Sequence, residues 1–493
     1  MQELIDLLAA RWWPAHGLDA CLLLAEFLAL LTIPSVLIQR RGRPQAALAW
    51  VLGLIAVPFA GVLIWWGIGR SHLLRRRRRR QSARARISPG LRAVGTRKQP
   101  ASSVDLLPAL HLPADEALDV FPAVGGNGVK VLVDGGETYA AIDRIARSGR
   151  HHVHFLFYAW QPDDVGRHFR DVLARRAQDG VQVRVLCDAV GSSRLSRRFL
   201  EPLRRAGGKV AFFMPTRLLR RSLTLNFRNH RKIVVVDGNV GYAGGLNIGA
   251  EYTGEWRDLG LLLSGPVVGQ LQEVFADDWF FATGENLAAG EFFPEASTAG
   301  EDVLGREGVH HGAICRLIAG GPDALHNATH DTFLIAANQA RHRIFITTPY
   351  LIPGPAIQAA LRTAVYRRLD VRLLVPRTPD VCLTRLAGRS FYPDLLAAGV
   401  RIFEYLPGTL HQKLWVFDDE LAAVGSANLD TRSFRLNFEA CCFIQSRSVN
   451  AELAELFLRD QALSEEVTPA SVKAAGRWEE FKEAVANLLS PLL

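Results

Sequence analysis

Cysteine is scarce in this sequence, and its pattern excludes two classes of protein. The chain has 493 residues and 6 cysteines. They form no CxxC pair and no regular spacing, which argues against a zinc site and against a disulfide framework. A chain of roughly three domain-equivalents has no need of such staples. A large core in a reducing compartment fits best; the six positions are Cys21, Cys187, Cys315, Cys382, Cys441 and Cys442.

Excess basic charge is missing from most of the chain. The protein carries 58 Lys and Arg against 49 Asp and Glu, a formal charge of +9. Residues 1–100 hold 16 of the basic and 4 of the acidic residues, which leaves 42 against 45 in residues 101–493. The main body, at −3, is a poor groove for a nucleic acid, and the basic N-terminal part favours an anionic membrane surface.

Charged residues are absent from the 23-residue run 46–68. This run exceeds the roughly 20 residues that a helix needs to cross the hydrocarbon core of a bilayer. An earlier run, 18–38, is as long but contains Asp19, Glu26 and Pro34. We predict that residues 1–70 form two transmembrane helices, arranged as a hairpin.

Arginines flank these runs. Arg40, Arg41 and Arg43 lie between them, and nine more follow the second run, at positions 70, 75–80, 84 and 86. By the positive-inside rule the larger group predicts a cytoplasmic body, although the three loop arginines conflict with two crossings. A nucleic-acid patch is the alternative for the arginine run, but beside a membrane span it favours contact with anionic headgroups.

The body follows a basic juxtamembrane segment and linker predicted at 71–120, where 87–120 mix Ser, Pro, Gly and charge without periodicity. Beyond it, β-type runs alternate with helical stretches, and the same order recurs after residue 310. We predict an α/β fold of two pseudo-symmetric lobes, each a mixed sheet flanked by helices. The expected boundaries are 121–290, a linker at 291–310, and 311–493 with a C-terminal helix; the expected strands are 153–158, 181–186, 209–213, 343–347, 371–375 and 400–403.

One motif occurs once in each lobe. NHRKIVVVDGNVGYAGGLN and LHQKLWVFDDELAAVGSAN align at an offset of 181 residues, and acids follow both at that offset. Two H-x-K-x4-D matches in one register indicate an internal duplication. The aligned pairs are His230 and His411, Lys232 and Lys413, Asp237 and Asp418, Gly245 and Ser426, Asn247 and Asn428, and Asp258 and Glu439.

These residue types suit a phosphodiester. The His and the Lys of each motif stand two residues apart on a strand, so they project to one face. Two facing half-sites would let the lysines neutralise the non-bridging oxygens, while the asparagine amides and the backbone at Gly245 and Ser426 donate to them. The histidines would divide nucleophilic and acid–base duty. Asp258 or Glu439 would each orient the imidazole of its own motif.

A metal site is the competing interpretation, and we disfavour it. The two lysines would repel a divalent cation, and no third histidine or carboxylate clusters with the histidines of the motifs. For the HHVH segment at 151–154 we predict the start of a strand with exposed imidazoles rather than a set of ligands. We expect no metal and no cofactor.

With these motifs the sequence resembles the phospholipase D superfamily, whose signature is a duplicated H-x-K-x4-D followed by G-[GS]-x-N. Within it the sequence is most similar to the bacterial cardiolipin synthases. The resemblance implies one active site shared by two lobes, with the six H-x-K-x4-D residues as its catalytic set. Further matching segments are RPQAALAW, NFRNHRKIVVVDG, GGLNIGAEY, EWRDLGLLLSGP, TPYLIP, GSANLDTRSFRLNFE and LLSPLL.

The resemblance also implies a reaction. One phosphatidylglycerol would give its phosphatidyl group to another through a phosphatidyl-histidine, yielding cardiolipin and glycerol in the bacterial inner membrane. The motifs are too alike to assign the nucleophile, although we favour His230. The alternative is a membrane-bound hydrolase, or a transferase that uses another alcohol acceptor. The expected partners are phosphatidylglycerol and anionic membrane lipids, with no nucleic acid and with a homo-oligomer left open.

Overall fold

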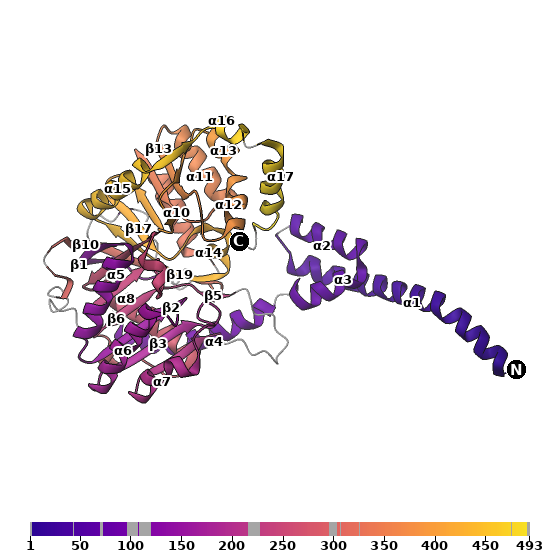
Figure 1. Cartoon of the computed structure of the whole chain (residues 1–493), viewed down its shortest axis with the longest axis horizontal. Coiled ribbons are helices and arrows are strands. Elements are labelled where there is room, and N and C mark those ends of the chain that lie inside the picture. The colour runs from indigo at the N-terminus through magenta and orange to yellow at the C-terminus, as the bar shows by residue number, and fades with distance from the viewer. Residues whose placement is uncertain are drawn as a thin grey trace. The chain divides into compact units, whose positions relative to one another are not determined.

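A computed structural model gives the fold (Figure 1). It describes residues 2–42, 44–69, 72–95, 107, 120–214, 227–294, 303–305, 307–324, 326–474 and 476–490. The chain divides into two compact units. Residues up to Gln81 belong to the first, and residues 82–216 and 225–493 form the second.

The N-terminal unit contains one described helix that is long and apolar enough to cross a membrane. This is the segment Ala20–Gln39 of α1 (Gln2–Gln39). A second transmembrane helix is not shown among the described residues, because the apolar run 46–68 is broken into α2 (Pro44–Ala56), α3 (Pro58–Ile64) and the π-helix η1 (Trp65–Gly69). Pro58 has no N–H to continue the helix. With 13 and 7 residues, α2 and α3 are about 20 and 10 Å long, short of the roughly 30 Å hydrocarbon core.

Helix α4 (His72–Val94) carries the arginine run and continues into the predicted linker. Ile87 and Leu91 are one helical turn apart on one face, and both are buried in the core of the second unit with Trp279. The linker prediction is therefore wrong for residues 87–94. Because this helix buries only Ile87 and Leu91 in this stretch, the sequence shows no apolar periodicity long enough to predict it.

The second unit is built on a single 16-stranded sheet. Its order is β4-β3-β2-β6-β7-β9-β1 in the first lobe, continuing as β10-β19-β17-β16-β11-β13-β14-β20 in the second, and the sixteenth strand, β5 (Arg228–Asn229), pairs with β19 off this path. The first-lobe strands are β1 (Val124–Val133), β2 (His152–Phe157), β3 (Gln182–Asp188), β4 (Lys209–Phe213), β6 (Ile233–Val236), β7 (Val240–Gly244) and β9 (Leu259–Ser264). The second-lobe strands are β10 (Val309–Gly320), β11 (Arg343–Thr347), β13 (Asp370–Pro376), β14 (Arg401–Tyr405), β16 (Leu414–Phe417), β17 (Leu421–Gly425), β19 (Asn437–Gln445) and β20 (Ser464–Val467).

The two halves of the sheet have the same pattern of strand directions on either side of its centre, where β1 and β10 pair antiparallel. On one side β2, β3 and β4 are parallel and β6, β7 and β9 antiparallel. On the other, β11, β13 and β14 are parallel and β16, β17 and β19 antiparallel. This arrangement confirms the two-lobed mixed α/β fold. Strand β10 begins at Val309, two residues inside the predicted linker.

Helices cover both faces of this sheet (Figure 1). One outer core per lobe lies under the first group of helices, while a central core under α8 and α15 extends across both lobes. The first group is α5 (Asp134–Ser148), α6 (Asp164–Gln178), α7 (Arg197–Arg205), α10 (Ala328–Gln339), α11 (Pro355–Tyr366) and α13 (Tyr392–Ala397). The others are α8 (Val267–Thr283), α12 (Cys382–Arg389), α14 (Thr431–Arg435), α15 (Arg447–Ala462), α16 (Pro469–Ala474) and α17 (Gly476–Asn487).

The HHVH segment does start strand β2, and the side chain of His151 is 42% exposed, but two of its three imidazoles are not exposed as predicted. His152 and His154 are fully buried. His154 stacks on Phe275 with ring centroids 4.4 Å apart, and its Nδ1 lies 2.9 Å from Oε1 of Gln272. Burial lowers the pKa of His152 to about 3. The two rings belong to the core because the face of β2 that carries them is covered by α8.

Candidate active site

Each motif lies at the start of a β-hairpin. His230 and Lys232 precede β6 of the β6–β7 hairpin, and His411 and Lys413 precede β16 of the β16–β17 hairpin. The apolar residues after each lysine are buried on both faces of the sheet, which fixes the register of the hairpin. A polar pair therefore stands at the end of a rigid strand in each lobe.

Short strands carry each histidine across to the other lobe. β5 (Arg228–Asn229) pairs in parallel with β19, and β15 (Thr409–Leu410) pairs in parallel with β8 (Trp256–Arg257). The N–H of His230 donates to the carbonyl of Phe438 at 2.9 Å, and that of His411 donates to the carbonyl of Arg257 at 2.7 Å. These two crossings bring the motifs of both lobes to one site.

The crossing decides which acid contacts which imidazole. Nδ1 of His230 lies 3.1 Å from Oε2 of Glu439, and Nδ1 of His411 lies 2.8 Å from Oδ2 of Asp258. The expectation that each acid orients the histidine of its own motif is therefore wrong: each acid serves the other lobe. We call His230, Lys232 and Glu439 the first half-site, and His411, Lys413 and Asp258 the second half-site.

Both carboxylates fix the tautomer of their imidazole. A carboxylate accepts only, so Nδ1 of each ring carries the hydrogen and Nε2 keeps a lone pair. Burial raises the pKa of Glu439, but the neighbouring His230 lowers it more, and the pKa lies below its usual value. Burial likewise raises the pKa of Asp258, but the neighbouring Lys413 and His411 lower it more, and this pKa also lies below its usual value. Both acids are thus charged acceptors at neutral pH.

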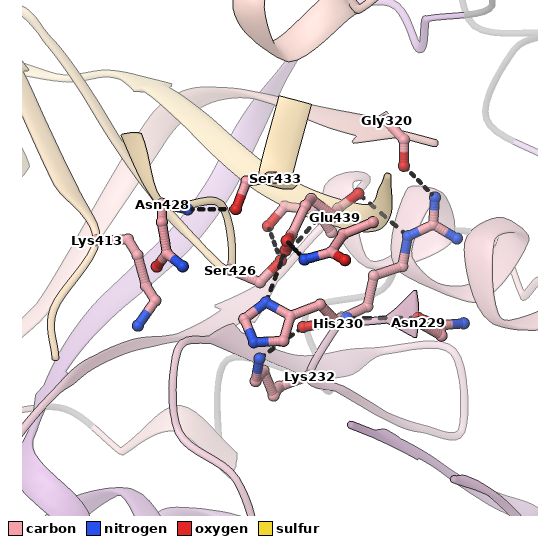
Figure 2. A network of polar contacts seen from close by, with 12 residues as sticks. Asn229, His230, Lys232, Gly320, Lys413, Ser426, Asn428, Ser433 and Glu439 are labelled. Atoms are coloured by element: carbon pink, nitrogen blue, oxygen red, sulfur yellow. Dashed lines mark hydrogen bonds and ion pairs between the residues drawn. The ribbon is translucent and has the colours of Figure 1, made fainter. Parts of the chain in front are cut away.

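The lysines are buried beside the histidines. Nζ of each lysine donates to the backbone carbonyl of its own histidine, at 2.6 Å for Lys232. Nζ of Lys413 also lies against the ring of His411, 2.6 Å from Nδ1 and 3.2 Å from Nε2. Figure 2 shows His230 directed at Glu439, with Lys232, Lys413 and Asn428 gathered around this network. Two cationic groups from two lobes therefore converge on one small volume, as a phosphate diester requires.

Burial also shifts the bases of the site. It lowers the pKa of His230 to about 4, against the opposing effect of Glu439, and it lowers the pKa of His411, with Lys413 adding to the fall. Desolvation lowers the pKa of Lys232 to about 7, and it lowers the pKa of Lys413. Both imidazoles are hence neutral bases at neutral pH before an anion binds. A bound phosphate anion would restore charge to the lysines.

Gly245 and Ser426 lie beside the two acids. A Cβ at Gly245 would stand 2.2 Å from Oδ1 of Asp258, so only glycine leaves room for that carboxylate. The hydroxyl of Ser426 instead donates to Oε2 of Glu439 at 2.5 Å. Both residues therefore act on an orienting acid rather than on a phosphate oxygen.

The two asparagines hold the loops behind the site. Oδ1 of Asn247 accepts from the N–H of Ala159 at 3.2 Å, and its Nδ2 donates to the hydroxyl of Tyr252 at 3.3 Å. Nδ2 of Asn428 donates to Asp430 at 3.2 Å. Asn428 remains close to Lys413 in Figure 2.

Asp237 and Asp418, which we expected in the catalytic set, lie elsewhere. Each occupies the hairpin turn at the far end of β6 or β16, about 16 Å of extended strand from the lysine of its motif, with a positive φ of 52° or 50°. The carboxylate of Asp237 accepts from the N–H groups of residues 150, 151 and 152, all at 2.8 Å. Asp418 does the same for residues 341, 342 and 343. Their position corrects the expectation: they tie the hairpin to the next strand.

Aromatic rings form walls beside both histidines. The ring of Tyr158 lies 5.0 Å from that of His230, and Trp256 lies 4.9 Å from His411. Trp160 and Tyr392 are buried in the cores of the two lobes. The sequence contains one signal for Trp256, because this residue stands two positions before Asp258, the acid of the first motif.

Two buried ion pairs support the crossings. Arg231 Nη1 lies 2.7 Å from Asp278, and Arg257 Nη2 lies 2.8 Å from Asp460. Both arginines flank a residue of the site, so each pair anchors the backbone that carries a histidine or an acid. Removing one partner of such a pair leaves an uncompensated buried charge.

Two facing lobes that each carry an H-x-K-x4-D motif are the arrangement expected of a phospholipase D-like enzyme. In agreement, the family model described as "Cardiolipin synthase, PLD-like domain" matches residues 141–279 and 333–461. The phosphatidylserine synthase of Haemophilus influenzae Rd KW20 has the same fold, with a TM-score of 0.55 and 16% identity over 74% of this chain and 95% of that one.

Curated relatives narrow the class. A cardiolipin synthase of Geobacillus thermodenitrificans is 37% identical over 92% of this chain and 89% of its own length. Cardiolipin synthase A of Pseudomonas fluorescens is 36% identical over 96% and 98%. The chain therefore belongs to the cardiolipin synthase family of phospholipase D-like enzymes.

Proposed function

We propose that this protein transfers a phosphatidyl group from one phosphatidylglycerol to another, giving cardiolipin and glycerol. The observation that carries the proposal is the pair of imidazoles, each held through Nδ1 by a carboxylate of the opposite lobe. This arrangement leaves two Nε2 atoms for the two tasks of a displacement at phosphorus, with two buried lysines for the anionic oxygens.

In the first half-reaction Nε2 of His230 attacks phosphorus, and the bond to the glycerol headgroup breaks. The departing oxygen takes the proton of His411, so glycerol leaves neutral and the phosphatidyl group stays on His230. Glu439 stabilises the positive charge that grows on the attacking ring. Asp258 stabilises the protonated form of His411, aided by the phosphate anion once it is bound.

In the second half-reaction His411 is neutral and acts as a base. It removes the proton from a headgroup hydroxyl of a second phosphatidylglycerol, whose oxygen attacks phosphorus while the P–N bond breaks. Cardiolipin forms, His230 is regenerated and His411 is again protonated. Water in place of the second lipid would give phosphatidic acid, so exclusion of water separates synthase from hydrolase.

Exposure supports the choice of His230 as nucleophile. Its side chain is 13% exposed, and that of His411 is 7% exposed. Each lysine donates to the backbone carbonyl of its own histidine, but Lys413 also lies against the ring of His411, 3.2 Å from its Nε2. The freer lone pair belongs to His230, which suits the atom that must reach phosphorus.

We also place the chain in the bacterial inner membrane, with the body on the cytoplasmic side. Cardiolipin synthases are membrane enzymes, and α1 presents large apolar side chains such as Leu23, Leu30 and Leu31, each at least 60% exposed. A bilayer would cover these side chains. The arginine-rich stretch that follows suits the anionic headgroups of the cytoplasmic leaflet.

The test is mass spectrometry of the products formed by the purified full chain in mixed micelles with phosphatidylglycerol alone, with chelator present. We expect cardiolipin and free glycerol in equal amounts, and neither from His411→Ala. As a control, His168→Asn should retain full activity, because His168 pairs with Asp143 on the surface at the same 2.8 Å. Phosphatidic acid without cardiolipin would contradict the proposal and indicate a hydrolase.

A further inference from the structure

We propose that residues 44–69 form a re-entrant hairpin, which dips into the bilayer from the cytoplasmic face and returns to that same face. Helix α1 is then the one crossing among the described helices, and the N-terminus lies on the outer side. This inference rests on the membrane attachment proposed above, and it does not depend on the chemistry of the active site.

The hairpin turns at Val57 and Pro58. Val57 has φ −138° and ψ 70°, which is outside the helical region, and Pro58 is the first residue of α3. Because proline cannot donate to the carbonyl four residues before it, the helical ladder of α2 ends here. A proline at the first helical position in turn suits the start of a new helix.

The two arms then pack side by side. A Cβ on Gly61 would lie 3.1 Å from both the carbonyl oxygen of Gly53 and the Cα of Leu54. In a straight helix residues 53 and 61 would be about 12 Å apart along the axis. The rings of Trp50 and Trp65, which a straight helix would separate by about 22 Å, have centroids 5.0 Å apart. The chain has therefore reversed direction.

Both ends of the hairpin lie level with the end of α1. Trp65 Nε1 donates to Ser35 at 3.3 Å, and Trp66 Nε1 donates to Thr32 at 3.1 Å. Arg40, which follows α1 directly, donates to the carbonyl of Gly69 at 3.2 Å. Residue 44, where the hairpin starts, is four residues from Arg40. The chain thus enters and leaves the hairpin at the same depth.

The hairpin carries exposed apolar side chains along both arms and at its turn. Six of its large apolar side chains are between 56% and 69% exposed within this unit, which is unfavourable in water and suits lipid. With 13 residues, α2 would reach about 20 Å into the bilayer, past its middle and short of the far side. The exposed residues are Leu48, Leu52, Ile55, Val57, Phe59 and Leu63.

This topology removes the conflict in the arginine distribution. With two crossings, Arg40, Arg41 and Arg43 would lie outside and the nine arginines after residue 69 inside. With a re-entrant hairpin all twelve lie on one face, and residues 1–17 on the other face contain the single Arg11. The positive-inside rule is then satisfied by both groups together.

The experiment uses three single-cysteine variants of the full chain, made after the two exposed cysteines are replaced by Cys21→Ala and Cys382→Ser. The new cysteines are Gln2→Cys, Gln45→Cys and Ser82→Cys, which mark the N-terminus, the start of the hairpin and the segment after it. Spheroplasts are treated with a membrane-impermeant maleimide before or after lysis. Cardiolipin formation in each variant shows that it is folded.

We expect Gln2→Cys to be labelled in intact spheroplasts, and Gln45→Cys and Ser82→Cys to be labelled only after lysis. Labelling of Gln45→Cys alone in intact spheroplasts would mean two crossings and overturn the proposal. Protection of all three would mean that α1 does not cross, which overturns it as well. If Gln45→Cys is inactive, Arg41→Cys replaces it, since that side chain is also exposed on the same connection.

Discussion

The two half-sites share a backbone and differ in the chemistry around the ring. In both, a histidine leaves its lobe on a short parallel strand and meets an acid of the other lobe. In both half-sites the lysine donates to the backbone carbonyl of the histidine, and in the second it also lies against the imidazole ring. The duplicated backbone thus places both histidines in the same way. The differences around each imidazole ring give the two histidines different chemical roles.

The acids illustrate how each half-site adjusts. Glu439 has one methylene more than Asp258, and its Oε2 is held by the hydroxyl of Ser426. Asp258 is shorter and its Oδ1 occupies the space that a side chain at Gly245 would take. The small residue of each motif and the acid beside it are therefore matched pairs, and exchanging one member alone would misplace the carboxylate.

Replacement of the two histidines should have the largest effect on activity. A lipid whose leaving group needs no proton should distinguish their roles. On phosphatidylglycerol, His230→Asn and His411→Asn should both lose activity by about 10³-fold or more. With phosphatidyl-p-nitrophenol, His411→Asn should still release a burst of p-nitrophenol and hold the phosphatidyl group on the peptide that contains His230. His230→Asn should give no burst.

Rapid-quench kinetics and peptide mass spectrometry would read this out. Equal bursts from both variants, or a label on the peptide of His411, would show that the roles are reversed or shared. His168→Asn is again the matched control, because its ring pairs with an acid on the surface.

The crossed acids should give the next largest effect. Asp258→Asn and Glu439→Gln should each lower kcat/KM on phosphatidylglycerol by about 10²–10⁴-fold, since an amide holds the wrong tautomer. Asp258→Asn should resemble His411→Asn and recover with the p-nitrophenyl lipid, while Glu439→Gln should resemble His230→Asn and not recover.

This pattern separates crossed from uncrossed pairing by kinetics alone. If Asp258→Asn failed to recover and Glu439→Gln recovered, each acid would serve its own motif. Asp143→Asn, which removes the acid of the surface His168 pair, controls for the loss of a carboxylate.

A smaller effect should distinguish the lysines by pH. Because burial lowers the pKa of Lys232 to about 7, this side chain is charged below that pH and neutral above it. The kcat/KM of the native protein should therefore fall as the pH rises above about 7, by roughly tenfold per unit as for one titrating group. Lys232→Arg stays charged and should move this limb to higher pH, at a lower plateau.

The measurement is the pH profile of kcat/KM from pH 5 to 10 in micelles, for Lys232→Arg beside Lys209→Arg. Lys209 is a surface lysine paired with Glu285, and its replacement should leave the profile in place. An alkaline limb that stays at the same pH in Lys232→Arg would assign it to another group.

Sequence reasoning predicted the architecture well because the evidence for it is local. Apolar periodicity predicted strands such as β2, β11 and β13 to within a few residues, and an offset of 181 revealed the duplication. Composition also identified the apolar run 46–68. It could not show that Pro58 turns the chain, because proline is tolerated inside membrane helices and only the packing of Gly61 on α2 decides.

The sequence predicted which histidines, lysines and acids form the site, but not which acid contacts which histidine. Which acid meets His230 depends on the parallel pairing of β5 with β19, a contact between residues more than 200 positions apart. The spacing of H-x-K-x4-D, which is the same in both lobes, also suggested one functional group of three. Because β6 is extended, this spacing in fact separates the aspartate from the lysine. Asp237 lies at one end of β6 and Lys232 at the other.

The smallest effect on chemistry should come from Asp237 and Asp418, where the two lobes are most alike. Each carboxylate binds three backbone N–H groups in a turn with positive φ, so Asp237→Ala and Asp418→Ala should each lower the free energy of unfolding by about 1–3 kcal/mol. Thermal unfolding in detergent would show a lower Tm, whereas kcat per folded molecule should stay close to that of Asp419→Ala, an exposed neighbour. A loss of kcat as deep as that of the histidine variants, with an unchanged Tm, would return these aspartates to the catalytic set. Equal losses of stability in both lobes would show that the halves diverged around their histidines while the hairpins that carry them stayed the same.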